Sequence, residues 1–263
     1  MSTTTSITKL SIIIPVYNEA KTVSLILDKI NQVQLIGNIK KELIKHLSQY
    51  VSSKRKDKID KVLKERTDYV SLVLEDINKP HNASATIRTC ECLGVQNIHI
   101  IENPENESPF FASNWVTQGA SKWVNLHRYK KKTPNNTKAC IDLLKKEGYM
   151  IIATSPDADS LSLDQIPLGK KLAFLFGNEE KGLSNYAFNE ADACLRLPMY
   201  GFTQSYNISV SVAITFSHGI ERLRASKVKW KLSEKEKRNL KLSWYKKSIR
   251  AGKMIEKAFL ETR

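Results

Sequence analysis

The part of the chain best suited to chemistry is a group of polar turns that follow short apolar segments. The apolar run Leu172–Phe176 leads into a polar turn ending at Ser184, and a second run leads into a turn ending at Gly201. Gln204–Asn207 then opens a long apolar segment. A glycine just past a strand end, such as Gly177, lets the backbone turn sharply or approach a ligand closely. Such turns at the strand ends of an α/β sheet commonly hold a small molecule, so the spacing predicts a ligand site.

The residues within these turns resemble those of a known enzyme family. Phe176–Ser184, Leu197–Met199 and Gln204–Asn207 are similar to the second and third motifs of the SpoU/TrmH family of RNA 2′-O-ribose methyltransferases, which belongs to the SPOUT superfamily. Asn78–Thr89 fits the first motif of that family. The three motifs stand in the family's order along the chain.

The resemblance implies a cofactor, a topology and an assembly. Members of the superfamily bind S-adenosylmethionine in a deep trefoil knot made by the C-terminal part of the chain, and they build the active site between the two subunits of a homodimer. No metal is required. Relatives hold the cofactor mainly through backbone groups, and the matching positions here are Gly177, Asn178, Leu197, Met199, Ser205 and Tyr206.

A second set of positions matches the polar residues around the reacting ribose in this family. They are Arg88, Glu179, Ser205 and Asn207, with Asn82 in support. A ribose 2′-hydroxyl is a poor nucleophile and needs its proton accepted as the methyl group arrives. The family proposal makes Arg88 the base, but a guanidinium has a pKa above 12, so that role demands a large shift. We expect Arg88 mainly to clamp the adjoining phosphate and orient the hydroxyl, and we expect His81 to be structural.

A sheet must position these residues. The pattern predicts strands at Tyr69–Leu74, Ile98–Ile101, Trp123–Leu126, Tyr149–Ala153 and Leu172–Phe176, with helices at Ala83–Leu93 and Thr137–Glu147. This alternation predicts an α/β fold with a mainly parallel sheet and helices on both faces. Gly94 is expected to end the first of these helices. A helix N-cap is the alternative role for Asn82 beside its supporting role at the ribose.

One segment gives conflicting signals. Ile208–Phe216 alternates in polarity and is rich in β-branched residues, which favours a strand. The family resemblance implies a helix that continues to Arg224. We predict the helix.

Positive charge is concentrated in two flanking segments. The formal net charge of the chain is +15; residues 38–66 hold ten Lys/Arg against four Asp/Glu, and residues 226–263 hold thirteen against four. We predict basic helical extensions at both ends, which favour a polyanionic partner held through its phosphates. Lys54–Arg66 resembles the helix that touches tRNA in relatives, and Trp244 and Tyr245 are available for packing or for stacking on RNA. The expected RNA contacts are Lys54, Arg55, Lys58, Arg66, Arg222 and Arg224.

The start of the chain resembles a different enzyme. Ser11–Ala20 is similar to the opening strand and turn of a family 2 glycosyltransferase, which also needs an Asp-x-Asp metal motif. Asp157 and Asp159 match that motif by letter, but we interpret them as surface acids. The expected division is a glycosyltransferase-like fragment at 1–37, a basic helical region at 38–66, a SPOUT methyltransferase domain at 67–225 and a basic helical tail at 226–263.

Composition argues against several other classes. None of the ten glycines forms Gly-x-Gly, so a dinucleotide-binding Rossmann loop and a P-loop are both unsupported. The four cysteines contain no Cys-x-x-Cys pair, and reduced thiols in a cytoplasmic protein are expected. No apolar run approaches the length of a membrane span.

The expected function is S-adenosylmethionine-dependent 2′-O-methylation of a ribose in tRNA. A D-loop guanosine is the expected target because Ile59–Asn82 resembles the tRNA-specific members more closely than the ribosomal-RNA members. Two alternatives stay open: a ribosomal-RNA 2′-O-methyltransferase of the same superfamily, and a nucleotide-sugar-binding protein related to glycosyltransferases.

Overall fold

A six-stranded parallel sheet forms the centre of the molecule. The computed structural model describes residues 37–103, 117, 119–131, 135–156 and 160–262. The strands are β1 (Thr67–Glu75), β2 (Val95–Ile101), β3 (Asn125–Tyr129), β4 (Tyr149–Thr154), β5 (Lys171–Phe176) and β6 (Ala193–Leu195). Their order in the sheet is β3-β2-β1-β5-β4-β6, and every pairing between neighbours is parallel. The predicted α/β class with a parallel sheet is confirmed.

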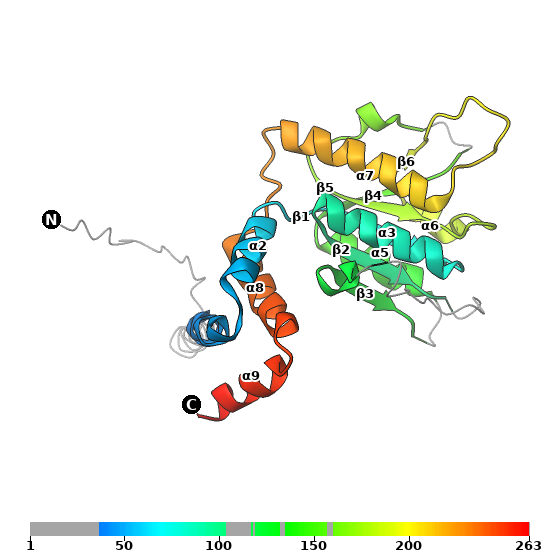
Figure 1. Ribbon diagram of the computed structural model, residues 1–263. Helices are drawn as coiled ribbons and strands as arrows, with labels where there is room; N and C mark the ends of the chain where they lie inside the picture. The colour runs from blue at the N-terminus through cyan, green and yellow to red at the C-terminus, as the bar shows by residue number, and fades with distance from the viewer. Residues whose placement is uncertain (1–36, 104–116, 118, 132–134, 157–159, 263) are drawn as a thin grey trace, which may run out of the picture.

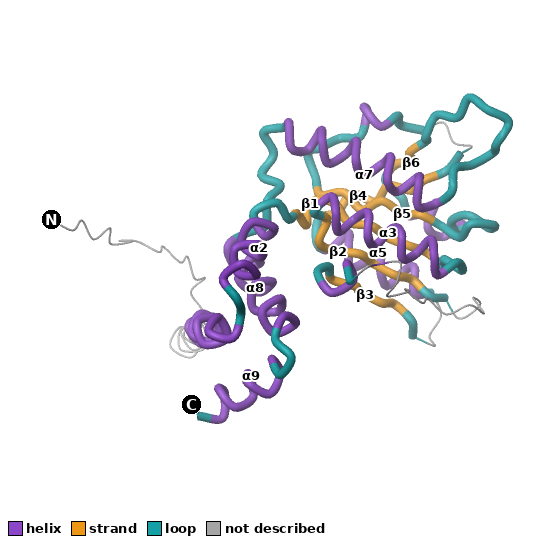
Figure 2. The backbone as a smooth tube through the Cα atoms, in the orientation of Figure 1, coloured by secondary structure: helices purple, strands orange, loops and turns teal. Residues whose placement is uncertain are grey.

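Helices cover both faces of this sheet (Figures 1 and 2). On one face α3 (Pro80–Leu93) and α7 (Ile208–Ala225) lie against each other, and on the other face lie α5 (Asn136–Lys146) and α6 (Asn185–Glu190). Short 3-10 turns occur at Ser48–Tyr50, Ala120–Lys122 and Leu163–Gln165.

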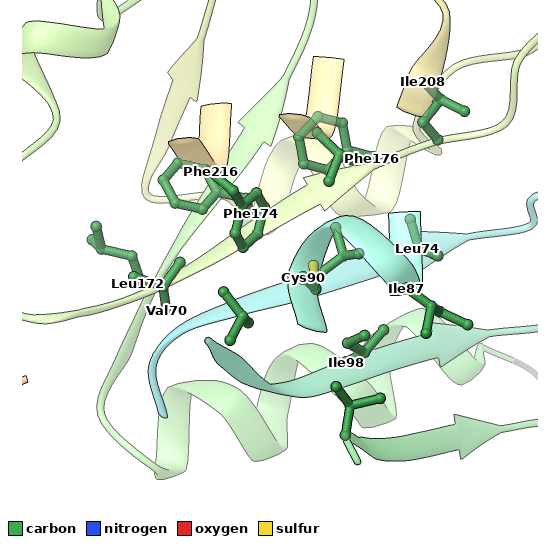
Figure 3. Packing of buried hydrophobic residues seen from close by; sticks show 14 of the residues in the cluster. Val70, Leu74, Ile87, Cys90, Ile98, Leu172, Phe174, Phe176, Ile208 and Phe216 are labelled. Carbon is green, nitrogen blue, oxygen red and sulfur yellow. The ribbon is translucent and has the colours of Figure 1, made fainter. Parts of the chain in front are cut away.

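The central strand β5 has apolar side chains on both faces. Phe174 and Phe176 point to the side of α7, where the rings of Phe174 and Phe216 meet edge to face at 5.5 Å between centroids (Figure 3). Ala173 and Leu175 belong to the cluster on the opposite face. Successive side chains of a strand point to opposite faces, so a strand covered on both sides must be apolar throughout.

The conflicting segment after Asn207 is helical, as predicted. Within α7 the fully buried positions Val212, Phe216, Ile220 and Leu223 recur every three or four residues and face the core. Helical spacing therefore fits the burial better than the local β-branched composition does.

Two local predictions around α3 had different outcomes. Gly94 ends the helix with a left-handed φ of 83°, as expected. The alternative role of Asn82 as the helix N-cap is excluded, because the helix begins at Pro80 and its N-cap is Lys79. Proline suits the first helical position, since its missing N–H would lack an intrahelical partner there. Asn82 therefore sits inside the first turn and its side chain is available for other contacts.

The edge strand β3 begins later than predicted. Trp123 was expected in this strand, but it follows a 3-10 turn and strand pairing starts at Asn125. The Trp123 ring instead packs edge to face on Trp244, with centroids 5.7 Å apart. A long-range aromatic contact has displaced the start of the strand.

The two basic flanks pack against each other. Residues 37–47 are helical and are followed by α2 (Ser53–Leu63), while the C-terminal flank forms α8 (Glu234–Ser248) and α9 (Gly252–Glu261). A third hydrophobic cluster joins them, including Leu47, Leu63, Trp244 and Tyr245. In Figure 1 the blue and red segments accordingly lie side by side. We call residues 37–64 and 232–261 the helical unit; Trp244 and Tyr245 are both buried in it, so their role here is packing.

All four cysteines, Cys90, Cys92, Cys140 and Cys194, are free. Among the described residues, no helix combines the length and the apolar character that crossing a membrane requires. The glycosyltransferase-like segment up to residue 36 and the acids at 157 and 159 lie outside the described residues.

A buried histidine on β2, His99, stacks on an exposed histidine on β3, His127. His99 is 3% exposed, its ring stacks on His127 at 4.6 Å, and its Nδ1 lies 3.1 Å from the Tyr129 hydroxyl oxygen. Burial, with a smaller contribution from His127, lowers the pKa of His99 from 6.5 to about 3. The folded protein therefore holds His99 neutral between about pH 3 and pH 6.5, where the unfolded chain would bind a proton.

This pair predicts a loss of stability in mild acid. A depressed folded-state pKa stabilises the fold fully above the unfolded-state pKa, and the contribution is lost as the pH falls below it. We expect His99 to cost about 2 kcal/mol of unfolding free energy between pH 7 and pH 5, at about 1.4 kcal/mol per pH unit. Urea unfolding of wild type and His99→Gln at both pH values measures this. Equal pH dependence in the two proteins would contradict the assignment.

Candidate active site

The predicted site residues gather at the carboxyl ends of β1 and β5, which are neighbours at the centre of the sheet. Strand order reverses between them, since β2 and β3 continue on one side and β4 and β6 on the other. Ligands of open α/β sheets bind at such switch points. Here the loop after β5 is tied to the loop after β1, because the Asn178 side-chain amide donates to the Asp76 carbonyl oxygen at 2.7 Å.

Hydrogen bonds join one residue from each of the three sequence motifs. The Asn82 amide nitrogen donates to Glu179 Oε1 at 2.9 Å, and the Asn207 amide nitrogen donates to Asn82 Oδ1 at 3.2 Å. Glu179 Oε2 also lies 3.4 Å from the backbone nitrogen of Asn78. Asn207 caps α7 in addition, with its Oδ1 accepting from the Ser209 backbone nitrogen. Residues far apart in sequence thus form one connected polar group.

The turn that carries Glu179 is closed tightly. Asn178 and Gly182 exchange backbone hydrogen bonds of 2.9 Å in both directions, and Asn178 Oδ1 accepts from the backbone nitrogens of Glu180 and Lys181. A Cβ placed on Gly177 would lie 2.2 Å from the carbonyl carbon of Gly182. No side chain fits there, so this turn requires glycine at 177.

A buried carboxylate that the sequence analysis missed anchors the far end of the same turn. Glu75 is 2% exposed, and its two oxygens accept from the backbone nitrogen and the hydroxyl of Ser184, each at 2.8 Å. Glu75 Oε1 also accepts from the Thr137 hydroxyl at 2.5 Å. Glu75 directly follows the predicted strand Tyr69–Leu74, and its burial depends on donors from α5 and from the residue that caps α6, which no local pattern reveals.

A mainly apolar cavity opens beside this polar group. Four of the six predicted cofactor positions line it, namely Leu197, Met199, Ser205 and Tyr206, and the other lining residues are Thr154, Ser155, Pro156, Phe176, Leu195 and Ser211. Gly177 and Asn178 do not line it but follow directly after Phe176, which does. The strand-end segment Thr154–Pro156 was missed, although its place after a predicted strand was a usable signal.

Arg88 stands apart from the other predicted catalytic residues. It lies on α3 and is exposed, and it makes no hydrogen bond or ion pair within the part of the chain that the structure describes. Ser205 faces the cavity rather than the hydrogen-bonded group of Asn82, Glu179 and Asn207. The structure therefore joins three of the five predicted catalytic residues directly.

The predicted RNA-binding residues fall into three groups. Lys54, Arg55 and Lys58 are exposed on α2. Arg222 donates to the Leu163 carbonyl oxygen at 2.6 Å, and Arg224 forms an exposed ion pair of 3.1 Å with Glu65. Lys54 and Lys58 are open to a partner, whereas Arg55 lies 5.9 Å over the Trp123 ring. The second group already has partners within the chain.

Arg66 alone forms the third group, and its predicted exposure to RNA needs correcting. Its side chain is fully buried, pairs with Glu91 at 2.6 Å and lies 5.4 Å over the Trp244 ring. Arg66 sits where the helical unit meets the sheet, and groups of the chain itself enclose its guanidinium in this structure. The expected RNA contact of Arg66 is corrected to a buried ion pair with Glu91.

Within the described residues, no group of three or more His, Cys, Asp or Glu side chains could hold a metal ion.

Comparison with known proteins decides the family. A model described as the SpoU rRNA Methylase family matches residues 69–217, which include all three motifs. The chain belongs to this family. A relative from Borreliella burgdorferi, named tRNA (guanosine(18)-2'-O)-methyltransferase, is 44% identical over 210 residues, covering 80% of this chain and 93% of the relative. A relative of the same name from Thermus thermophilus is 36% identical, covering 65% of this chain and 84% of that one.

A solved structure gives the same family assignment. The crystal structure of the A. aeolicus TrmH/SpoU tRNA modifying enzyme matches with a TM-score of 0.63 and 27% identity, covering 74% of this chain and 96% of that chain. The match extends beyond the family core, since the residues 69–217 make up a smaller share of the chain.

Proposed function

We propose that this chain transfers a methyl group from S-adenosylmethionine to the ribose 2′-hydroxyl of a guanosine in the D-loop of tRNA. The observation that carries the proposal is the hydrogen-bonded group of Asn82, Glu179 and Asn207, which unites the three family motifs beside the cavity. The names of the Borreliella and Thermus relatives support tRNA and guanosine as the substrate.

The cavity fits the proposed cofactor. Its walls are apolar where Phe176, Leu195 and Leu197 line it, and hydroxyl groups of Ser205 and Tyr206 add a few polar contacts. Ligand sites for small organic molecules combine such apolar walls with few polar groups. Gly177 keeps the backbone bare at the start of the neighbouring turn, where a Cβ would collide. When bound there, S-adenosylmethionine supplies an electrophilic methyl group.

The chain's own residues would position the nucleophile. Asn82 is held between Glu179 and Asn207, so its orientation is fixed before RNA binds. Glu179 and Asn207 keep oxygen and nitrogen atoms at the rim, where a ribose hydroxyl can be oriented. Arg88, exposed and without an ion-pair partner among the described residues, is free to clamp the phosphate next to that ribose. Fixing the hydroxyl and its phosphate supplies the orientation part of catalysis.

We infer two further properties of the site, a homodimer and a C-terminal knot. Tyr200 and Phe202 are almost fully exposed apolar residues in the loop that borders the cavity, and Val210 is exposed on the first turn of α7. A second copy that packs over these residues would complete the active site around Arg88, which stands apart from the other catalytic residues in the single chain. The chain also adds β6 beside β4 and then returns so that Asn207 meets Asn82, a path that supports the knotted topology.

Methyl transfer tests the proposal. Labelled S-adenosylmethionine is offered to unmodified tRNA transcripts, with ribosomal RNA alongside. We expect label in tRNA that maps to one 2′-O-methylguanosine. Label in ribosomal RNA alone would favour the ribosomal alternative, and binding of a nucleotide-sugar without any methyl transfer would favour the glycosyltransferase-related one.

A tRNA substrate and four free cysteines support a cytoplasmic location.

A substitution at Gly177 tests the role of the turn. Gly177→Ala should force residues 178–182 to move, because the new methyl group would meet backbone atoms at 2.2 Å. A shift of about 1 Å in a positioning group can cost about 100-fold in rate, so we expect a loss of that order in kcat. Steady-state kinetics measures it, and Gly169→Ala, where a Cβ meets nothing within 4 Å, is the matched control. Equal rates in both variants would rule out this role.

A further inference from the structure

The helical unit contains a groove that none of the predicted RNA-binding residues lines. It runs between the first helix (37–47), the end of α2 and the start of α8, and encloses about 530 Å³. Ile44 and Leu63 contribute its apolar lining, and most of the other lining residues are charged. A water molecule occupies about 30 Å³ in the liquid, so the groove has room for a much larger group.

The charges in the groove do not cancel. Five cationic side chains line it against two carboxylates. Both carboxylates are already paired, Asp60 with Lys241 at 2.6 Å and Glu234 with Lys237 at 2.8 Å.

The remaining cations are Lys41, Lys64 and Arg238, one from each wall of the groove. Lys41 and Lys64 are exposed and have no ion-pair partner in the described part of the chain. Arg238 makes a small contribution to the lowered pKa of Glu234, after the larger one from Lys237, but forms no ion pair with it. The groove therefore carries three positive charges in excess.

We propose that this groove binds the phosphodiester backbone of the RNA substrate, an inference that rests on the proposed function. Three cations on three separate helices, facing one concave surface, suit successive phosphates rather than one small anion. Lysine and arginine contacts of this kind give affinity without sequence preference and release counterions from the RNA.

The position of the groove adds a requirement on that RNA. The helical unit joins the amino end of β1 through Arg66, whereas Asn82 and Glu179 lie beyond its carboxyl end. Nine residues of strand extend about 30 Å at roughly 3.3 Å each. An RNA that touches the groove and the site of one chain must extend over this distance, which a folded tRNA does.

Salt dependence of binding tests the groove. We would measure the affinity of an unmodified tRNA transcript from 50 to 200 mM salt for wild type and for the triple variant Lys41→Gln, Lys64→Gln, Arg238→Gln. Each lost phosphate contact lowers the slope of log K against log salt by about 0.7 to 0.9, so we expect a slope reduced by about 2 to 3. Affinity at the lowest salt should fall at least about 10-fold, with S-adenosylmethionine affinity unchanged.

A matched variant separates the groove from overall charge. Lys130→Gln, Lys146→Gln, Lys170→Gln removes three exposed lysines outside the helical unit, and we expect it to retain most of the wild-type slope. Equal slopes in the two triple variants would overturn the groove, even if the wild type methylates tRNA. Absence of methyl transfer to any RNA would instead refute the proposed function, and the slope comparison would still decide whether the groove holds phosphate.

Discussion

Arg88→Ala is expected to lower the kcat for methyl transfer to tRNA by about 100- to 1,000-fold, the loss typical when one preorganised hydrogen-bond donor at a transition state is removed. Affinity for S-adenosylmethionine should stay the same, because Arg88 does not line the cavity. The fold should also persist, because the side chain is exposed and makes no hydrogen bond or ion pair with the other described residues. Kinetics with tRNA, together with cofactor binding by calorimetry, measures both quantities.

The replacement by lysine separates the two roles considered for Arg88. A lysine keeps the charge and can act as a base when its pKa is lowered, but it lacks the planar two-donor geometry for phosphate. If Arg88 is a phosphate clamp, Arg88→Lys raises the KM for tRNA and lowers kcat together. If it is the base, kcat recovers in part as the pH rises while the KM is unchanged. Cys92→Ala, an exposed change one turn further along α3, is the control and should behave as wild type.

Local sequence was sufficient for much of the sheet and for the turns that carry the polar set. Strand β5 could be predicted because a strand covered on both faces must be apolar throughout, as Leu172–Phe176 is. Gly94 could be assigned to a helix end because its left-handed conformation favours glycine. Only the family motifs predicted the grouping of Asn82, Glu179 and Asn207, because Asn82 is 97 positions from Glu179 and 125 from Asn207.

What the sequence could not supply depends on contacts between distant segments. Trp123 was expected in a strand, but its ring packs on Trp244, 121 positions further along the chain. Local sequence patterns do not reveal this contact, because Trp244 lies in the C-terminal flank. Glu75 lies just past the predicted strand Tyr69–Leu74, and its burial depends on the hydroxyl donors of the distant residues Thr137 and Ser184. Alternating polarity in Ile208–Phe216 favoured a strand, and only the packing of α7 on α3 gives it a helical environment. In each case tertiary contacts override the local propensity.

Arg66 is the clearest such case, and its surroundings explain why a basic residue is buried there. Its Nη2 pairs with Glu91 at 2.6 Å, Nη1 donates to the Val95 carbonyl oxygen at 3.3 Å, and the guanidinium lies over the Trp244 ring. Its Nε has no hydrogen-bond partner among the described residues, and burial lowers the pKa of the group against the opposing effect of Glu91. Arg66 thus joins β2, α3 and α8 while remaining an expensive charge to bury.

Removing Glu91 should therefore destabilise the protein strongly. Glu91→Ala leaves the Arg66 charge buried without its partner, and we expect a loss of about 3 kcal/mol of unfolding free energy. Glu65→Ala is the matched control, because its ion pair with Arg224 is exposed and should be worth less than about 1 kcal/mol. The double replacement Arg66→Met, Glu91→Leu removes both charges and should recover most of the loss. Urea unfolding measures all three variants.

The same double variant decides whether Arg66 ever meets RNA. If the buried position is its working position, the variant binds tRNA with the wild-type dependence on salt, because no phosphate contact has been removed. A reduced salt slope in a protein of near wild-type stability would mean that Arg66 leaves its site to bind RNA. We expect the unchanged slope, since exposing Arg66 would break its pair with Glu91 and open the packing around Trp244 at the junction that holds the helical unit to the sheet.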